Sequence, residues 1–283
     1  MGKPATTSYV VQFASRRDST CVVKGENNVE WLEVMHPTQL ANFVAFCKAR
    51  GRRIYLRGQN SLHPGLLPSL FRQPGDSHTK WRAYNAFVRQ LPSSVKGTRF
   101  RRRNFGAVLQ HYGFRTPWLD VVDDIYTAVW FALNKAQPVD GRYCYGRSNS
   151  DAGWIALISA PRAIRRQDLR ETQSSRNTRC HAQQGWSLAM QHDAQVRFNQ
   201  QQDFADHVVG TIRIPNAVEW HLEGFMASQR YLFPKEEMDD TYKQLQSKEV
   251  ADLAARIEDD EGLQQGVLGR VALYAEAAGT PAV

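Results

Sequence analysis

Three short segments of the chain carry the residue types that could do chemistry, and the first is residues 55–59. Here Arg57 and Gly58 stand at the end of a short run of β-branched and aromatic residues that is typical of a strand. A guanidinium in this place presents a fixed fork of donors to a phosphate or carboxylate. Glycine lets a ligand approach the backbone closely, because it has no Cβ. The structural alternative is an arginine that bridges loop carbonyls or pairs with an acid of the core.

The second segment, residues 110–120, concentrates polar side chains at the junction of two apolar helices: Gln110, His111, Tyr112, Thr116 and Asp120. Ordinary packing would place apolar groups there, and a buried polar group is costly unless it is paired. We therefore expect these side chains either to form a hydrogen-bonded network or to face a cleft.

The third segment, residues 179–186, sets two amides, Gln183 and Gln184, directly before Gly185 and a predicted strand. This arrangement suits a backbone that approaches a ligand closely. Taken alone, it is equally typical of a turn.

Charge and composition narrow the class of protein. The chain has 283 residues, 42% of them hydrophobic, and a formal net charge of +8. Such a chain is globular, and its positive charge favours a polyanionic partner. The densest basic run contains Arg99, Arg101, Arg102 and Arg103 with Phe100 between them. It predicts phosphate contact and base stacking on a nucleic acid, whereas a solvated face is the alternative.

The compartment follows from the cysteines and from the apolar runs. The four cysteines show no C-x-x-C spacing, which argues against a zinc ribbon and a disulfide framework. The N-terminus lacks the apolar run of a signal peptide, and no segment approaches the roughly 20 apolar residues of a membrane span. We expect a cytoplasmic protein with reduced thiols, no resident metal and no membrane partner.

Periodicity and breakers predict the elements that position these segments. Strands are expected at 9–13, 52–56, 154–158, 186–190 and 208–214, and helices at 37–47, 81–91, 105–112, 123–136 and in the tail 243–277. These elements predict an α+β fold. We divide the chain into an N-terminal extension (1–30), a main domain (31–240) and a helical C-terminal appendage (241–283).

Together, the segments resemble the FRG domain, a family named for its Phe/Tyr-Arg-Gly signature. The signature stands at 55–59 and is followed by the family-like sequence at 67–72. The family's Gln-His-x-Gly motif and its later Thr, Leu and Asp are matched within 110–120. Its Ala-x-x-Phe-Ala helix is matched at 128–132, and its Gln-Gly element ends at Gly185. The closing motifs are matched near 224 and 231–234, so the resemblance spans about residues 30–240. Pro117, Trp118 and 121–123 depart from the family pattern.

A strand that ends in aromatic-x-Arg-Gly is also similar to the first motif of ADP-ribosyltransferases. This second resemblance implies small β-sheets flanked by helices, with NAD as co-substrate and its pyrophosphate on Arg57. It further implies the following site. Gly58, Gln59, Thr116 and Asp120 bind the cofactor beside Arg57, while His111 and Tyr112 contact the ribose or nicotinamide. Gln184 stands where such enzymes carry a late glutamate, but it lacks the charge.

The resemblance implies an NAD-dependent ADP-ribosyltransferase that acts as a bacterial toxin or phage-defence effector. Its expected substrate is DNA or RNA, and an inhibitor protein is an expected partner. Two alternatives stay open. One is a metal-dependent nuclease or phosphoesterase that uses His111, Asp120, Asp123 and Asp124, since carboxylates and imidazole are suitable ligands. The other is a nucleic-acid or nucleotide-binding module without catalytic activity.

Overall fold

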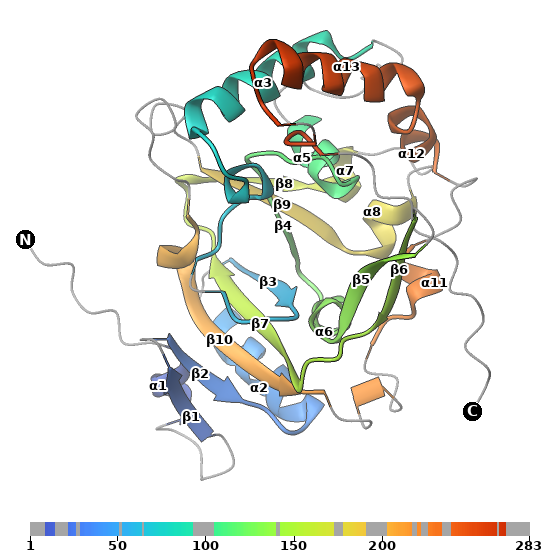
Figure 1. Ribbon diagram of the computed structural model, residues 1–283. Coiled ribbons are helices and arrows are strands. Elements are labelled where there is room, and N and C mark those ends of the chain that lie inside the picture. The colour runs from blue at the N-terminus through green and yellow to red at the C-terminus, as the bar shows by residue number, and fades with distance from the viewer. Residues whose placement is uncertain are drawn as a thin grey trace, which may run out of the picture.

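The computed structural model describes residues 9–14, 22–26, 29–50, 53–63, 65–92, 105–139, 142–172, 178–190, 203–216, 220–221, 226–233, 239–264 and 266–269. Helices and a mixed sheet confirm the α+β class (Figure 1). The expectation of small sheets is wrong, because eight strands form one sheet and only two form a separate hairpin.

In the middle of the large sheet, two neighbouring strands pair at one position only. The order of the sheet is β1 (Val22–Glu26), β2 (Val29–Glu33), β10 (Val208–Pro215), β7 (Ala152–Ser159), β3 (Ile54–Gln59), β4 (Leu119–Val122), β9 (Gly185–Met190) and β8 (Ile164–Asp168). Neighbours are antiparallel except β2 and β10. β3 pairs with β7 along its whole length, but it pairs with β4 only at Leu56 and Val122. This narrow joint between β3 and β4 leaves room for polar side chains.

Three helices pack on the half of the sheet that contains β3: α1 (Tyr9–Ala14), α2 (Pro37–Lys48) and α6 (Ile125–Leu133). The strand predicted at 9–13 is therefore wrong. Tyr9, Val10 and Phe13 are buried together, and this spacing makes one face of a helix that packs against α2 and β10. Tertiary burial has outweighed the β-propensity of this segment.

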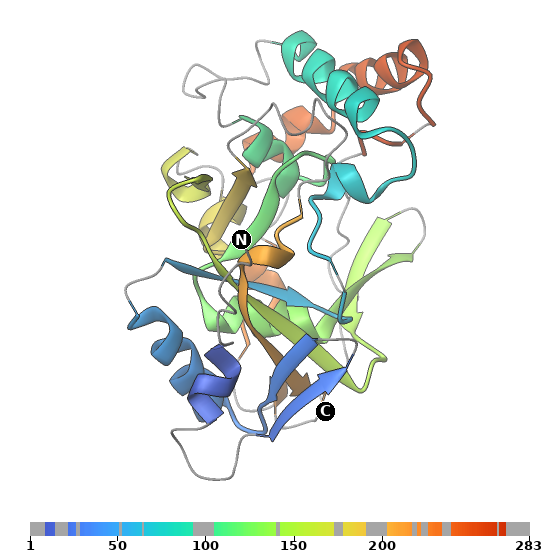
Figure 2. The same ribbon diagram turned by 90° about the vertical axis from the view of Figure 1, so that its left-hand side faces the viewer.

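The other half of the sheet, with β4, β9 and β8, lies near α5 (Phe105–His111) and the C-terminal helices. α3 (Ser77–Gln90), α12 (Asp240–Leu245), α13 (Lys248–Asp260) and α5 contribute to one core. α3 and α13 lie side by side at one end of the molecule (Figure 2). Gly262 and Gly266 both have positive φ, as expected of breaks after a helix.

The helix predicted at 123–136 is shorter than expected. Asp124 caps it at its start, and the chain leaves the helix after Leu133 to form β5 (Asn134–Val139) and β6 (Arg142–Arg147). At this end of the helix, the Asn60 side-chain amide donates hydrogen bonds to the carbonyls of Phe131, Ala132 and Asn134. β4 is a further difference, because Leu119 and Asp120 were expected to belong to the junction between two helices.

The remaining elements are short: η1 (Ser69–Arg72), α7 (Leu169–Thr172), α8 (Thr178–Ala182), η2 (Ala205–His207) and α11 (Gln229–Leu232). None of the described helices combines the length and the apolar character that crossing a membrane requires. The division at residues 30 and 240 stays a prediction.

Candidate functional site

Arg57 lies at the joint between β3 and β4. Side chains alternate along β3, so Arg57 shares a face with Tyr55, whereas Leu56 and Gly58 face α6. The Arg57 Nη1 donates to the backbone carbonyl of Asp120 at 2.5 Å. Its Nε is buried and has no hydrogen-bond partner in the described part of the chain. Burial, and then the charge of Arg72, lowers the pKa of Arg57 to about 10.

Asp120 is held from two sides. Ser187 donates to its Oδ1 at 3.2 Å, and the Gln110 amide donates to its Oδ2 at 3.4 Å. Burial raises the pKa of Asp120, while the charge of Arg57 opposes that rise. The carboxyl is therefore fixed in place beside a buried cation.

Gln110 joins this carboxyl to two other motifs. Its Oε1 accepts from Ser69 at 2.7 Å and from Thr116 at 2.9 Å. Thr116 is fully buried, and its hydroxyl also accepts from the Trp118 N–H at 3.1 Å. The polar group at 110–120 is thus a hydrogen-bonded network, as one of the two expectations had it. Thr116 is engaged within it instead of being free for a cofactor.

Arg72 adds a positive charge near this site that the sequence interpretation missed, and His63 lies near both arginines. Arg72 lies three residues after Ser69 on η1, and its Nε donates to the Leu67 carbonyl at 2.7 Å. Burial lowers the pKa of Arg72, and the charge of Asp120 opposes that shift. Burial lowers the pKa of His63, and the charges of Arg72 and Arg57 lower it further. The only sequence signal was the family-like segment 67–72, which contains Arg72.

His111 is 8% exposed, and its Nε2 finds no hydrogen-bond partner among the residues that the structure describes. Burial, and then the charge of Arg179, lowers the pKa of His111 to about 3, although a hydrogen bond with the Arg179 backbone works the other way. The imidazole is therefore neutral at pH 7. A Cβ at Gly185 would lie 3.3 Å from the His111 Cε1, so this glycine makes room for the ring.

Tyr112 belongs to the core between α5 and α12. Its ring is fully buried, and its hydroxyl donates to the Asp239 carboxylate at 2.7 Å. Asp239 also caps α12 by accepting from the Tyr242 N–H at 3.0 Å. These contacts engage the Tyr112 hydroxyl and are typical of a structural residue.

Gly58 serves helix packing instead of ligand approach. A Cβ there would lie 2.1 Å from the Ala128 carbonyl and 2.7 Å from the Ala132 nitrogen. The backbone of α6 therefore fills the space that we expected a cofactor to occupy. Gln59, the last residue of β3, is half-buried.

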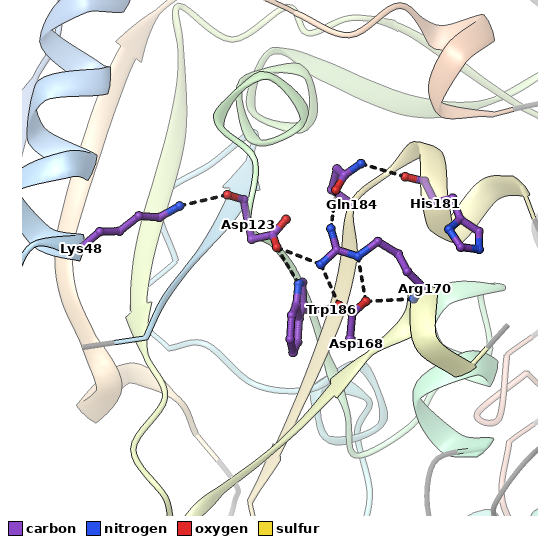
Figure 3. A network of polar contacts seen from close by, with 7 residues as sticks. All are labelled: Lys48, Asp123, Asp168, Arg170, His181, Gln184 and Trp186. Atoms are coloured by element: carbon purple, nitrogen blue, oxygen red, sulfur yellow. Dashed lines mark hydrogen bonds and ion pairs between the residues drawn. The ribbon is translucent and has the colours of Figure 1, made fainter. Parts of the chain in front are cut away.

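Gln184 lies in a separate network around Arg170 (Figure 3). Arg170 Nε and Nη2 donate to the two Asp168 oxygens at 2.8 and 2.7 Å, and Nη2 also contacts Asp123 at 3.0 Å. Its Nη1 donates to Gln184, which has a φ of 48°. Trp186 Nε1 donates to the same Asp123 oxygen at 2.9 Å. Gln184 is thus a turn residue fixed by Arg170, and the structure does not bring it to Arg57.

The four residues of the metal-site alternative are not gathered. Asp123 is bound by Arg170 and Trp186, and Asp124 accepts from the Thr127 N–H at 2.7 Å as the cap of α6. Within the described ranges, no group of three or more metal-ligating side chains occurs. The basic run with Arg99, Arg101, Arg102 and Arg103 lies outside the described residues.

Comparison with known proteins matches residues 52–141 to the family model of the FRG domain. The match contains Arg57, His111 and Asp120, and it ends before the segment with Gln184. No curated protein and no solved structure matches the chain.

Proposed function

Because the chain carries an FRG domain at residues 52–141, we propose that it is an NAD-dependent ADP-ribosyltransferase whose Arg57 binds the NAD pyrophosphate. One observation carries this proposal: the buried Nε of Arg57, which has no partner in the described structure. A buried charged donor without a partner is costly, and a phosphate oxygen is the partner that a guanidinium binds best.

The surrounding charge supports an anionic ligand. Arg57 and Arg72 both lie near one buried carboxyl, Asp120, so the cluster carries excess positive charge. A diphosphate would neutralise this excess and would raise the pKa of Arg57 back toward its ordinary value. Electrostatics therefore favour a nucleotide over an uncharged ligand.

In this proposal Asp120 serves the chemical step. When the C–N bond to nicotinamide breaks, the ribose carries positive charge and nicotinamide leaves with the bonding electrons. An acceptor oxygen or nitrogen then bonds to the ribose and loses a proton. A carboxylate beside the ribose stabilises that charge, and Asp120 is already oriented by Gln110 and Ser187. Neutral His111 supplies an acceptor for a ribose hydroxyl.

In this proposal Gln184 and Tyr112 have structural roles and do not contact NAD. The proposed biological role is that of a bacterial toxin or phage-defence effector of the cytoplasm, where NAD is abundant. Consumption of NAD harms the host cell, so an inhibitor protein is the expected partner.

A binding module without turnover is the second candidate. It is favoured by the fact that both oxygens of Asp120 already accept hydrogen bonds, from Ser187 and Gln110. Such a module would use Arg57 and Arg72 for phosphate contact alone.

The test compares the wild-type protein with Arg57→Ala, each incubated with NAD and separate DNA, RNA and protein pools. Arg82→Ala is the matched control, because Arg82 is an exposed arginine of α3 that pairs with Glu261. We expect wild type and Arg82→Ala to release nicotinamide and to add ADP-ribose mass to one pool. Arg57→Ala should lose about 100-fold or more of this rate.

Undiminished release by a folded Arg57→Ala protein would contradict the assigned role. Protection of the wild-type fold by NAD without nicotinamide release would favour the binding module.

A further inference from the structure

Arg72 is a second guanidinium near Asp120, and most of its donors have no partner in the protein. Its Nε donates to the Leu67 carbonyl at 2.7 Å, and within the described ranges Arg72 makes no other hydrogen bond and no ion pair. Arg72 is also exposed, so the N–H donors of both Nη groups can reach a ligand.

Hydrogen bonds fix the short helical turn η1, which carries Arg72, to the network around Asp120. At the start of η1, the Ser69 hydroxyl donates to the Gln110 side chain at 2.7 Å and accepts from the Thr116 N–H at 3.2 Å. Gln110 in turn donates to the Asp120 carboxyl at 3.4 Å. Arg57 donates to the backbone carbonyl of the same aspartate. The fold therefore brings the two arginines to one place from two separate elements, β3 and η1.

The two arginines lie at different depths. Arg57 is half-buried, with its Nε enclosed and unpartnered in the described structure, whereas Arg72 is exposed. The charge of Arg72 lowers the pKa of Arg57, so the two cations are close enough to repel each other. Asp120 is the acid whose charge acts on both, and residues 34–75, which include both arginines, contain no Asp or Glu. One inner and one outer cation thus share one carboxyl.

We propose that Arg72 binds the outer phosphate of a diphosphate ester whose inner phosphate lies on Arg57. A single phosphate on Arg57 would leave the outer guanidinium to water. A diphosphate extends outward and gives each guanidinium its own phosphate oxygens, which are the acceptors that an arginine fork matches. Arg72 therefore makes the site select two linked phosphates over one. That this ester is NAD rests on the proposed function, whereas the selection of a diphosphate does not.

The test measures binding of inorganic pyrophosphate and of inorganic phosphate by isothermal titration calorimetry, at pH 7 without divalent cations. The full-length wild type is compared with Arg72→Gln, which removes the charge but keeps an amide that can donate to the Leu67 carbonyl. The control is Arg82→Gln, which removes one charge from an exposed arginine of α3. Thermal melts confirm that each protein is folded.

Wild type and Arg82→Gln should bind pyrophosphate at least about tenfold more tightly than phosphate, because the second phosphate gains a charged hydrogen-bonding partner. Arg72→Gln should lose about tenfold in affinity for pyrophosphate but no more than about threefold for phosphate. Arg57→Gln should weaken the binding of both ligands. If Arg72→Gln does not fold, Arg72→Lys keeps the charge without the fork and should lower the preference for pyrophosphate by about threefold.

An unchanged preference for pyrophosphate in Arg72→Gln would overturn the proposal, and so would the absence of pyrophosphate binding by the wild type. Equal losses in Arg72→Gln and Arg82→Gln would also overturn it, because net charge alone would then explain binding. The two proposals fail separately. A wild type that selects pyrophosphate through Arg72 without turning over NAD takes a different diphosphate ester. NAD turnover together with an unchanged preference in Arg72→Gln contradicts only the role of Arg72.

Discussion

Two arginines of this protein stand beside carboxyl groups, yet their surroundings differ. Arg170 binds Asp168, Asp123 and Gln184 through all three guanidinium nitrogens. The hydrogen bonds to Asp168 raise the pKa of Arg170. Arg57 has only the Asp120 carbonyl as a hydrogen-bond partner in the described structure, and burial lowers its pKa to about 10.

This difference separates a structural cation from one that awaits a ligand. The network of Arg170 is complete, so it holds the turn at Gln184 against β4. The site around Arg57 has an unmatched donor and excess positive charge, which is what an anion-binding site has before its ligand arrives.

The largest expected effect concerns the glycine beside Arg57. Gly58→Ala would place a Cβ 2.1 Å from the Ala128 carbonyl, and this neighbour is helix backbone, which cannot rotate away as the end of a side chain can. We expect a loss of at least about 3 kcal/mol in the free energy of unfolding, measured by urea denaturation. Gly146→Ala is the control and should be nearly neutral, because nothing lies within 4 Å of that Cβ. An unchanged free energy of unfolding in Gly58→Ala would contradict the packing role of Gly58 and would favour a role in ligand approach.

His111 provides the next test, since it also has a buried atom without a described partner. Its folded pKa of about 3 lies below its ordinary value of 6.5. Between these values the unfolded chain binds more protons, so stability falls as the pH drops from 6.5 toward 3. Between pH 7 and pH 4 the wild type should lose about 3 kcal/mol more than His111→Gln, as urea titrations at both pH values will show. Equal losses would contradict a neutral, buried imidazole.

The two arginines can be compared directly by replacing each with methionine. Arg170→Met leaves two carboxylates without their cation and should cost about 2 kcal/mol, allowing for partial exposure. Arg57→Met removes a buried charge with one carbonyl partner and should cost no more than about 1 kcal/mol. Chemical denaturation at pH 7 measures both. If Arg57→Met were the more destabilising of the two, Arg57 would be structural.

The smallest effect is expected at Asp120. Its raised pKa means that the folded protein binds the proton more tightly than the unfolded chain. Stability therefore falls as the pH rises from the ordinary value of 3.8 through the folded pKa. Asp120→Asn should lack this fall in melting-temperature profiles across mildly acidic pH. An identical profile would show that Asp120 is not buried beside Arg57.

The sequence was sufficient to find the motifs, but not to tell which of their residues are structural and which are available to a ligand. The network at Gln110, Thr116 and Asp120 was foreseen as one alternative, because polar residues in an apolar setting must be paired. The roles of Gly58 and Gln184 were not, since a glycine that admits a helix looks the same in sequence as one that admits a ligand. Arg72 and His63 were missed because charge proximity across η1 depends on tertiary structure.

The types of the helices and strands were likewise predictable only where they do not depend on tertiary packing. Long periodic segments such as α2 and α3 were predicted from their apolar spacing. The short strand β4 was missed, and α1 was predicted as a strand. Only packing against α2 and β10 decides the state of that six-residue segment.

The central claim is that Arg57 binds the phosphates of NAD, and calorimetric titration of NAD into wild type, Arg57→Ala and Arg82→Ala tests it most directly. The account predicts saturable binding by wild type and Arg82→Ala, weakened by roughly 10- to 100-fold in Arg57→Ala, as befits one charged hydrogen-bonding group. Equal affinity in all three proteins, or no binding by the wild type, would contradict it.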